Sequence, residues 1–232
     1  MDAGRLMCVS PLLVMLLLHG GLHGQDKKKT ELVYTKTNGN MDAKVSFVLE
    51  FAPSSKTGFV QMQCSTSGRF RESEAVPWEP VAEKAGDSLF LDVRTWALLR
   101  RQPDGSMQEV PRFEAINIVL PLHQWMRDVD DGFQRTETLP TFGLDYTLVQ
   151  EYRTVGREEV SGREAFVVEE TLFEKESGKI HEVRKHWVDV EYRIRLKKTV
   201  SRDGQIVDED RLLEMIVGPE LDELKARIQP GR

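Results

Sequence analysis

Hydrophobic and polar residues alternate along much of the chain, which is the pattern of β-strands with one buried face. Val45, Phe47, Leu49 and Phe51 occupy every second position of one segment. A second apolar segment over residues 59–65 follows a short turn, so the two segments predict a hairpin.

The second half of the chain, from Tyr146 onward, predicts four or five consecutive strands. Three turn signals separate them, namely Ser161-Gly162, Ser177-Gly178 and Asp203-Gly204. Such dipeptides favour tight hairpin turns, so this half is expected to be an antiparallel meander of long strands. Residues 179–188 have charged residues at both even and odd positions, so both faces of that strand carry charge. We therefore expect the strand to be largely solvated.

Helical periodicity is confined to two segments. Residues 115–134 fit a helix interrupted at Pro121, and residues 219–227 fit a short helix near the C-terminus. A parallel α/β fold is disfavoured because helices do not alternate with strands. The sequence predicts a mainly β (α+β) fold, with one curved antiparallel sheet forming an unclosed half-barrel under a helical lid.

The chain begins with the pattern of a secretory signal peptide over residues 1–24, with an apolar core at residues 6–18 and Gly24 before the expected cleavage site. Lys27, Lys28 and Lys29 follow directly and disfavour translocation, so an uncleaved membrane tether is the alternative. Residues 25–43 are polar and predict a flexible entry, and residues 44–232 predict a single β domain. The expected location is the periplasm or the medium.

Charge and cysteine content exclude several classes of protein. The net charge of -6 and the pI near 5.5 offer no basic surface for nucleic acid. Once the leader is removed, Cys64 is the single cysteine, so an intrachain disulfide is excluded. We expect a monomer.

Patterns for metal binding or catalysis are weak. His181 and His186 are five positions apart on a predicted strand and therefore face opposite sides. The acidic run over residues 128–137 does not have the spacing of a calcium loop. Glu169 and Glu170 are adjacent on a strand and cannot share a proton. We therefore expect no metal, no cofactor and no enzymatic activity.

Several short motifs carry a family resemblance over residues 44–232. They are Gly68-Arg69-Phe70-Arg71, residues 87–90 with Trp96, Trp187-Val188-Asp189, Arg202-Asp203-Gly204 and Gln229-Pro230-Gly231. In these motifs the chain resembles the bacterial LolA/LolB-like superfamily of periplasmic lipoprotein carriers and outer-membrane lipoprotein-sorting proteins. The resemblance implies an unclosed barrel with a helical lid, whose concave side holds acyl chains.

The residues expected to line that concave side are large, apolar and spaced along the predicted strands. They are Phe47, Leu49, Phe51, Met62, Phe70, Phe90, Trp96, Leu98 and Trp125. Ordinary core packing is the competing explanation for each of them. By the resemblance, Arg69 helps to control the lid, although a solvated strand arginine is the favoured explanation. Trp78 lies between two prolines in a loop suited to contact with a partner.

Two main hypotheses follow, and an enzyme built on this fold is kept as a third. The first is a periplasmic lipid- or lipoprotein-binding carrier, whose partner is a lipid or a lipidated protein. The alternative is an envelope interaction or sensor module that contacts another envelope protein and has no small-molecule ligand.

Overall fold

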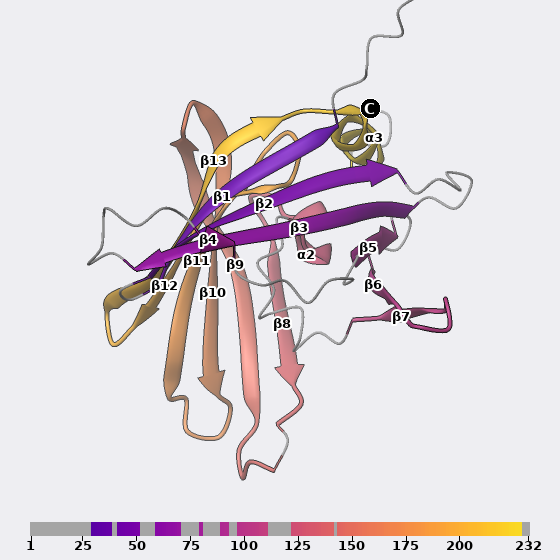
Figure 1. Cartoon of the computed structure of the whole chain (residues 1–232). Coiled ribbons are helices and arrows are strands. Elements are labelled where there is room, and N and C mark those ends of the chain that lie inside the picture. The colour runs from indigo at the N-terminus through magenta and orange to yellow at the C-terminus, as the bar shows by residue number, and fades with distance from the viewer. Residues whose placement is uncertain are drawn as a thin grey trace, which may run out of the picture.

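The computed structural model describes residues 29–38, 41–51, 59–70, 79–80, 89–92, 97–110, 122–141 and 143–228. Thirteen strands pair into one antiparallel sheet in the order β7-β6-β5-β3-β2-β1-β13-β12-β11-β10-β9-β8, and β4 pairs with β3 beside this path. Strands β1 to β3 run across the direction of β9 and β10, so the sheet curves strongly (Figure 1). The order ends at β7 and β8, which do not pair with each other in the described chain, so the sheet is unclosed.

The first half of the chain supplies seven strands. They are β1 (Thr30–Asn38), β2 (Met41–Phe51), β3 (Phe59–Phe70), β4 (Glu79–Pro80), β5 (Leu89–Asp92), β6 (Leu98–Arg101) and β7 (Met107–Glu109).

The second half supplies two helices and six strands. They are α2 (Gln124–Asp128), β8 (Gln134–Leu139), β9 (Leu148–Val160), β10 (Arg163–Glu174), β11 (Ile180–Asp189), β12 (Arg195–Arg202), β13 (Gln205–Ile216) and α3 (Pro219–Ile228).

The predicted turn signals coincide with the hairpin turns of the meander. Ser161 and Gly162 both have positive φ (53° and 76°), as do Asp203 and Gly204 (49° and 77°). Two consecutive positive φ angles match the right-handed twist of the flanking strands, and Gly adopts them without steric cost. The turns therefore fix the registers of β9 with β10 and of β12 with β13.

Two clusters of buried residues hold the helices against the sheet. The first includes Leu32 and Leu49 of β1 and β2 with Leu221 and Leu224 of α3. The second includes Trp125 and Met126 of α2 with Phe166, Val168 and Val188. We call the side of the sheet that carries Val168 and Leu49 the inner face.

The start of α3 is tied to β1 by hydrogen bonds. Pro219 opens the helix, where its missing N–H is not needed. Thr30 donates from its backbone N–H and its hydroxyl to Glu220 Oε2, at 3.2 and 3.0 Å, and the Gly218 N–H donates to Thr30 Oγ1 at 2.9 Å. The predicted short C-terminal helix is thus found where the sequence placed it.

The fold class predicted from the sequence is confirmed: the chain is mainly β, with one curved, unclosed antiparallel sheet and short helices. In the described part of the chain, neither helix has the length and apolar character needed to span a bilayer.

Three local predictions are wrong. The first concerns residues 25–43, which were expected to form a flexible entry. Residues 30–38 instead form β1, a strand in the middle of the sheet. Leu32 and Tyr34 are fully buried there. Their spacing of two is a strand signal that the polar residues around them obscure.

The second concerns the helix expected over residues 115–134. Among its described residues, 122–134, Gln124–Asp128 is helical, Val129 is already extended, and Gln134 begins β8, so the prediction fails after Asp128. Residues 111–121 lie outside the described part of the chain. Asp128, Asp130 and Asp131 at the end of this helix oppose its dipole, which favours termination there.

The third concerns the strand at residues 179–188, expected to be largely solvated. It is β11, an interior strand, and Glu182, His186 and Asp189 in it are buried. Their charges are accommodated because neighbouring strands supply partners, as described next.

Candidate functional site

Strand register aligns charged residues across the inner face. His186 of β11 lies opposite Lys198 of β12, Lys198 lies opposite Asp210 of β13, and Asp210 lies opposite Lys36 of β1. One step along the strands, Glu170 of β10 lies opposite Arg184 of β11. We call Glu170, Arg184, His186, Lys198 and Asp210 the inner charged row.

Glu170 is the centre of the hydrogen bonding in this row and is only 3% exposed. Its Oε1 accepts hydrogen bonds from Arg184 Nη1 and Gln150 Nε2, both at 2.8 Å. Its Oε2 lies 2.7 Å from His186 Nε2. A buried carboxylate is tolerated only when charges and donors of this kind compensate for lost hydration, so Glu170 depends on three side chains from the two neighbouring strands, β9 and β11.

The pKa values of Glu170 and His186 depend on their burial and on the interaction between the two side chains. Burial by itself would raise the pKa of Glu170, but the hydrogen bond and charge of His186 and the charge of Arg184 lower it to about 2. Burial lowers the pKa of His186, and the hydrogen bond to Glu170 only partly opposes this. Both pKa values are thus lowered, which at neutral pH corresponds to a neutral His186 that donates from Nε2 to an ionised Glu170.

Asp210 is fully buried at the other end of the row. Lys198 Nζ lies 3.1 Å and Arg195 Nη2 lies 3.6 Å from its Oδ2. The Tyr34 hydroxyl donates to the Arg195 carbonyl oxygen at 2.6 Å and so fixes the backbone of that arginine. Burial lowers the pKa of Lys198 below its usual value, and the nearby Asp210 carboxylate only partly opposes this.

Trp125 of α2 packs against the row. Its ring centroid lies 5.3 Å from that of His186 and 5.5 Å from that of Tyr152. His123 stacks on Trp125 with a centroid distance of 6.0 Å, and burial lowers the pKa of His123 well below the usual value. Trp125 therefore keeps His186 and its partner Glu170 away from water.

Two arginines hold the segment after α2 on the inner face. Arg193, at a positive φ of 57°, donates from Nη1 to the Val129 carbonyl oxygen. Arg157 donates from Nε and Nη2 to the Asp131 carboxylate, at 2.8 Å each. Their guanidinium groups also lie 4.7 and 4.6 Å from the ring centre of Phe166. The cover over the charged row is thus pinned at its C-terminal end.

The same face of the sheet is apolar at its other half. Register places Phe47 opposite Cys64, Leu49 opposite Met62, and Phe51 opposite Val60. Met62 and Val60 in turn lie opposite Leu89 and Leu91 of β5, and Leu91 lies opposite Leu98 of β6. The inner face is therefore divided into a mainly apolar half on β2, β3, β5 and β6, in which Arg100 of β6 lies opposite Leu89, and a charged half on β9 to β13.

The sequence-predicted site residues fall into separate groups. Phe47, Leu49, Phe51, Met62, Phe70 and Leu98 share the apolar half of the inner face by register. Phe90 has the opposite strand parity, lies opposite Gln61 and is 2% exposed. Trp125 is buried over the charged half, in a different cluster from Leu49. Arg69 of β3 lies opposite Asp42 of β2. Trp78 and Trp96 lie outside the described residues.

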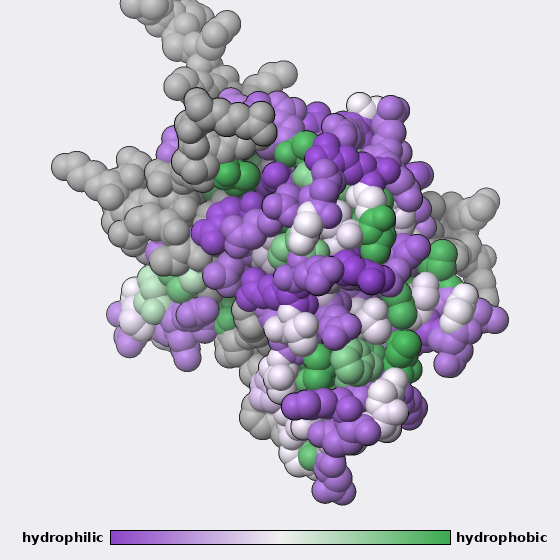
Figure 2. Space-filling model, turned by 180° about the vertical axis from the view of Figure 1, so that it is seen from behind, coloured by the Kyte–Doolittle hydropathy of each residue, from purple (hydrophilic) through white to green (hydrophobic). Residues whose placement is uncertain are grey.

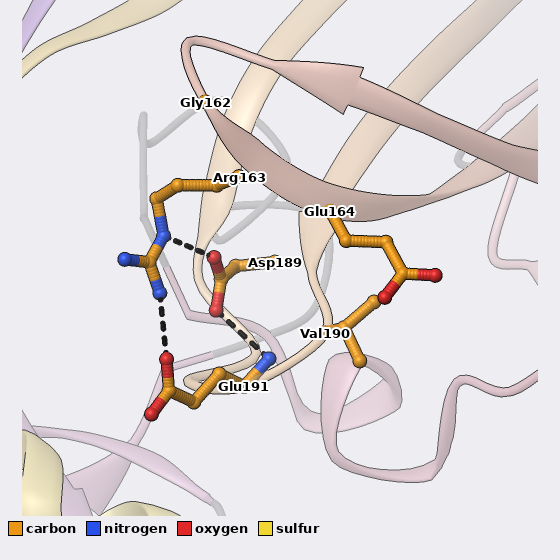
Figure 3. Close-up of a pocket in the computed structure, with 6 residues that line it drawn as sticks. All are labelled: Gly162, Arg163, Glu164, Asp189, Val190 and Glu191. Atoms are coloured by element: carbon orange, nitrogen blue, oxygen red, sulfur yellow. Dashed lines mark hydrogen bonds and ion pairs between the residues drawn. The ribbon is translucent and has the colours of Figure 1, made fainter.

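A pocket of about 280 Å³ lies at the turns that open β10 and close β11, lined by Gly162, Arg163, Glu164, Asp189, Val190 and Glu191 (Figure 3). Arg163 donates to Asp189 and, at 3.1 Å, to Glu191. Asp189 Oδ1 also accepts from the backbone N–H groups of Glu191 and Tyr192, at 2.9 and 2.6 Å. These contacts stabilise the turn between β11 and β12, so the pocket is explained without a ligand.

Sequence reasoning missed the inner charged row. Its signal was available: in residues 184–188 and 196–200, consecutive charged or polar residues are flanked by apolar ones on strands that hairpin order places inside the sheet. A charge at an interior position requires a cross-strand partner. Among the described residues, no group of three His, Cys, Asp or Glu side chains is arranged to hold a metal ion.

The fold and site together define a class: an unclosed antiparallel half-barrel whose inner face is partly apolar and partly charged. No family model and no curated protein matches the chain. Among solved structures, it is similar to a chain of the Pseudomonas aeruginosa MucA/MucB complex, with a TM-score of 0.41 and 11% identity. That alignment covers 88% of this chain and 56% of the other, so this chain spans little more than half the length of its match.

Two further similarities cover most of both chains. The lipoprotein LppX of Mycobacterium tuberculosis aligns over 82% of this chain and 87% of its own, with a TM-score of 0.36 and 6% identity. A LolA superfamily protein from Nitrosomonas europaea aligns over 84% and 87%, with a TM-score of 0.29 and 9% identity. The superfamily suggested by the sequence motifs is thus represented among the matching structures. Similarity at this level carries no information about the ligand, which has to be argued from the residues.

Proposed function

We propose that the protein is an exported carrier that binds a lipid or the acyl chains of a lipidated protein. The observation that supports this proposal is the apolar register of the inner face that runs from Leu49 of β2 through Met62 of β3 to Leu89 of β5, and from Phe51 through Val60 and Leu91 to Leu98 of β6. An apolar surface on consecutive strands suits an extended hydrocarbon chain, which needs contact area and no hydrogen bonds.

The charged half of the inner face does not compete for this role. Arg184 and His186 both bond to Glu170, and Trp125 of α2 packs against His186. This favours a structural role for the charged half over catalysis, and we propose a binding protein rather than an enzyme. The expected signal peptide at residues 1–24 fits a site of action in the envelope.

Binding of a fluorescent fatty acid to the purified protein tests the proposal. Met62→Asp places a charge at the centre of the apolar half, and we expect affinity to fall about tenfold or more, because a carboxylate opposes burial of the chain. Gln61→Asp is the matched control, since the neighbouring residue has the opposite strand parity, and it should bind like the wild type.

Circular dichroism has to show that both variants are folded. Equal affinity in the two variants, or no binding by the wild-type protein and no lipid in its organic extract, would contradict the proposal. Mass spectrometry of that extract identifies the native ligand class.

An envelope interaction module without a small ligand is the second candidate. Strand β8 favours it, since it is an edge strand of the sheet formed by the described residues, and its exposed residues Gln134, Thr136 and Thr138 alternate with half-buried ones. An unpaired strand edge can accept an extended segment of another protein.

Pull-down from envelope extracts separates the candidates. If a docking surface is the function, Thr136→Pro in β8 or Trp78→Ala should reduce recovery of the partner severalfold, because proline removes a ladder N–H and alanine removes an aromatic anchor. A carrier should tolerate both changes and keep its fatty-acid affinity.

A further inference from the structure

The two buried acids of the inner charged row differ in how their oxygens are bonded. Both carboxylate oxygens of Glu170 have hydrogen-bond partners. Asp210 is fully buried, yet neither of its carboxylate oxygens has one. Lys198 Nζ and Arg195 Nη2 lie 3.1 and 3.6 Å from Asp210 Oδ2, close enough for attraction between the charges but outside hydrogen-bond geometry. The row is therefore satisfied at Glu170 and unsatisfied at Asp210.

Two neighbours of Asp210 also have buried polar atoms without hydrogen bonds. Arg195 is 2% exposed, and its Nε and Nη2 donate to no acceptor. His186 is 4% exposed, and its Nδ1 has no partner. On the outer surface, which is mostly hydrophilic in Figure 2, water completes such bonds, whereas buried polar groups almost always have a specific partner. We call the Asp210 carboxylate, the Arg195 guanidinium and His186 Nδ1 the Asp210 site.

The three groups of the Asp210 site lie close together on the inner face. His186 lies opposite Lys198 and Lys198 lies opposite Asp210, so two strand spacings, about 10 Å, separate the backbones of His186 and Asp210. Arg195 lies opposite Val188, the next inner residue of β11. Burial is the main cause that lowers the pKa of His186, and the charges of Arg195 and Lys198 lower it further, as expected for side chains that face one another.

Strand β1 connects this site with the apolar half of the inner face. Asp210 lies opposite Lys36 of β1, and Lys36 lies opposite Ala43 of β2. Ala43 directly precedes the segment of β2, residues 45–51, at which the apolar half begins. Two strand spacings, about 10 Å, therefore separate Asp210 from β2, and a lipid with its acyl chain along β2 can bring its polar end to Asp210.

The unpartnered atoms of the site comprise both donors and acceptors. Arg195 donates, the Asp210 oxygens accept, and a neutral His186 that donates from Nε2 to Glu170 offers Nδ1 as an acceptor. A carboxylate ligand supplies no donor and brings a second negative charge to Asp210. An ammonium supplies no acceptor and is repelled by Arg195 and Lys198. A hydroxyl group is uncharged and both donates and accepts, so it fits the whole set.

We propose that the Asp210 site binds the hydroxyl groups of a neutral polyol, and that the ligand is an acyl ester of glycerol or of a similar polyol. The hydroxyls donate to Asp210 and to His186 Nδ1 and accept from Arg195, while the acyl chain lies on the apolar half. This inference rests on the proposed carrier function and adds the class of lipid to it.

Competition among lipids of one chain length tests the inference on the wild-type protein. Monopalmitoylglycerol, methyl palmitate and palmitate are each used to displace the fluorescent fatty acid. We expect monopalmitoylglycerol to act at a concentration about tenfold or more below the other two, because buried polar atoms discriminate against a ligand that leaves them unpaired.

Asp210→Asn and Glu209→Gln are a matched pair of variants. Each replaces one carboxylate of β13 by an amide, but Glu209 has the opposite strand parity and pairs with Lys197 at 3.6 Å. The preference for monopalmitoylglycerol should fall to about threefold or less in Asp210→Asn, because the amide replaces an accepting oxygen by NH2. It should persist in Glu209→Gln. Circular dichroism checks the fold of both variants, and if Asp210→Asn does not fold, the wild-type competition decides.

Equal displacement by the three lipids would overturn the inference, because the unpartnered atoms would then be bonded to water. It would also be overturned if palmitate were the strongest competitor, which indicates an anionic head group, or if folded Asp210→Asn kept the preference. The carrier proposal survives each of these results. Absence of binding of both the fluorescent fatty acid and monopalmitoylglycerol would contradict the carrier proposal, and the polyol site with it.

Discussion

Glu170→Gln is expected to lower the free energy of unfolding by about 3–5 kcal/mol, the cost of breaking a buried ion pair by removing one partner. Glu170 is 3% exposed and receives hydrogen bonds from Arg184 and Gln150, with His186 as its third partner. Glutamine fills nearly the same volume but removes the negative charge. It also replaces one of the two carboxylate oxygens that accept hydrogen bonds by an NH2 group, which cannot accept them. Urea denaturation at neutral pH measures the loss.

The same residue predicts a pH dependence of stability. The pKa of Glu170 is lowered in the folded state to about 2, against an ordinary value of 4.5. A carboxyl with a lowered folded-state pKa stabilises the protein above its unfolded pKa and loses that contribution as pH falls. The wild type should therefore lose about 3 kcal/mol between about pH 4.5 and pH 2, and the glutamine variant should lose correspondingly less.

The adjacent Glu169 supplies the control. It faces the other side of the sheet, where it lies opposite Lys185 and Arg153 and is only half-buried. Glu169→Gln should change the free energy of unfolding by less than about 0.5 kcal/mol. Equal effects of the two substitutions, or an acid profile of the Glu170 variant identical to that of the wild type, would show that the inner charged row does not support the fold.

The features predictable from the sequence are those set by local chemistry. Ser161-Gly162 and Asp203-Gly204 determine where strands reverse, because few residues adopt two positive φ angles, and both turns are found where they were predicted. The alternation from Val45 to Phe51 predicted a strand with one buried face, and fully buried Leu49 agrees with it.

The missed features depend on non-local pairing. β1 joins β2 to β13, and its polar sequence gives little indication that a partner about 180 residues away will bury Leu32 and Tyr34. Similarly, nothing local distinguishes Glu170 from Glu169. Only the register of β9, β10 and β11 brings Gln150, Arg184 and His186 to one carboxylate. Site prediction from the sequence therefore found apolar strand positions and missed the charged ones.

Trp125→Ala is the second large effect, with an expected loss of about 3–5 kcal/mol in the free energy of unfolding. Trp125 contributes the largest apolar side chain of α2 to the cluster with Tyr152, Phe166 and Val168. Alanine leaves a cavity beside the charged row, and α2 is too short, at five residues, to remain helical without this packing.

A spectroscopic measurement separates this effect from general destabilisation. Burial is the largest cause that lowers the pKa of His186. When Trp125 is removed, water reaches the imidazole, so its pKa, followed by NMR, should rise toward the ordinary value of 6.5. Trp125→Phe keeps most of the cover and should shift the pKa far less. A His186 pKa that is unchanged in the alanine variant would show that other residues exclude water from the row, and that Trp125 contributes only packing.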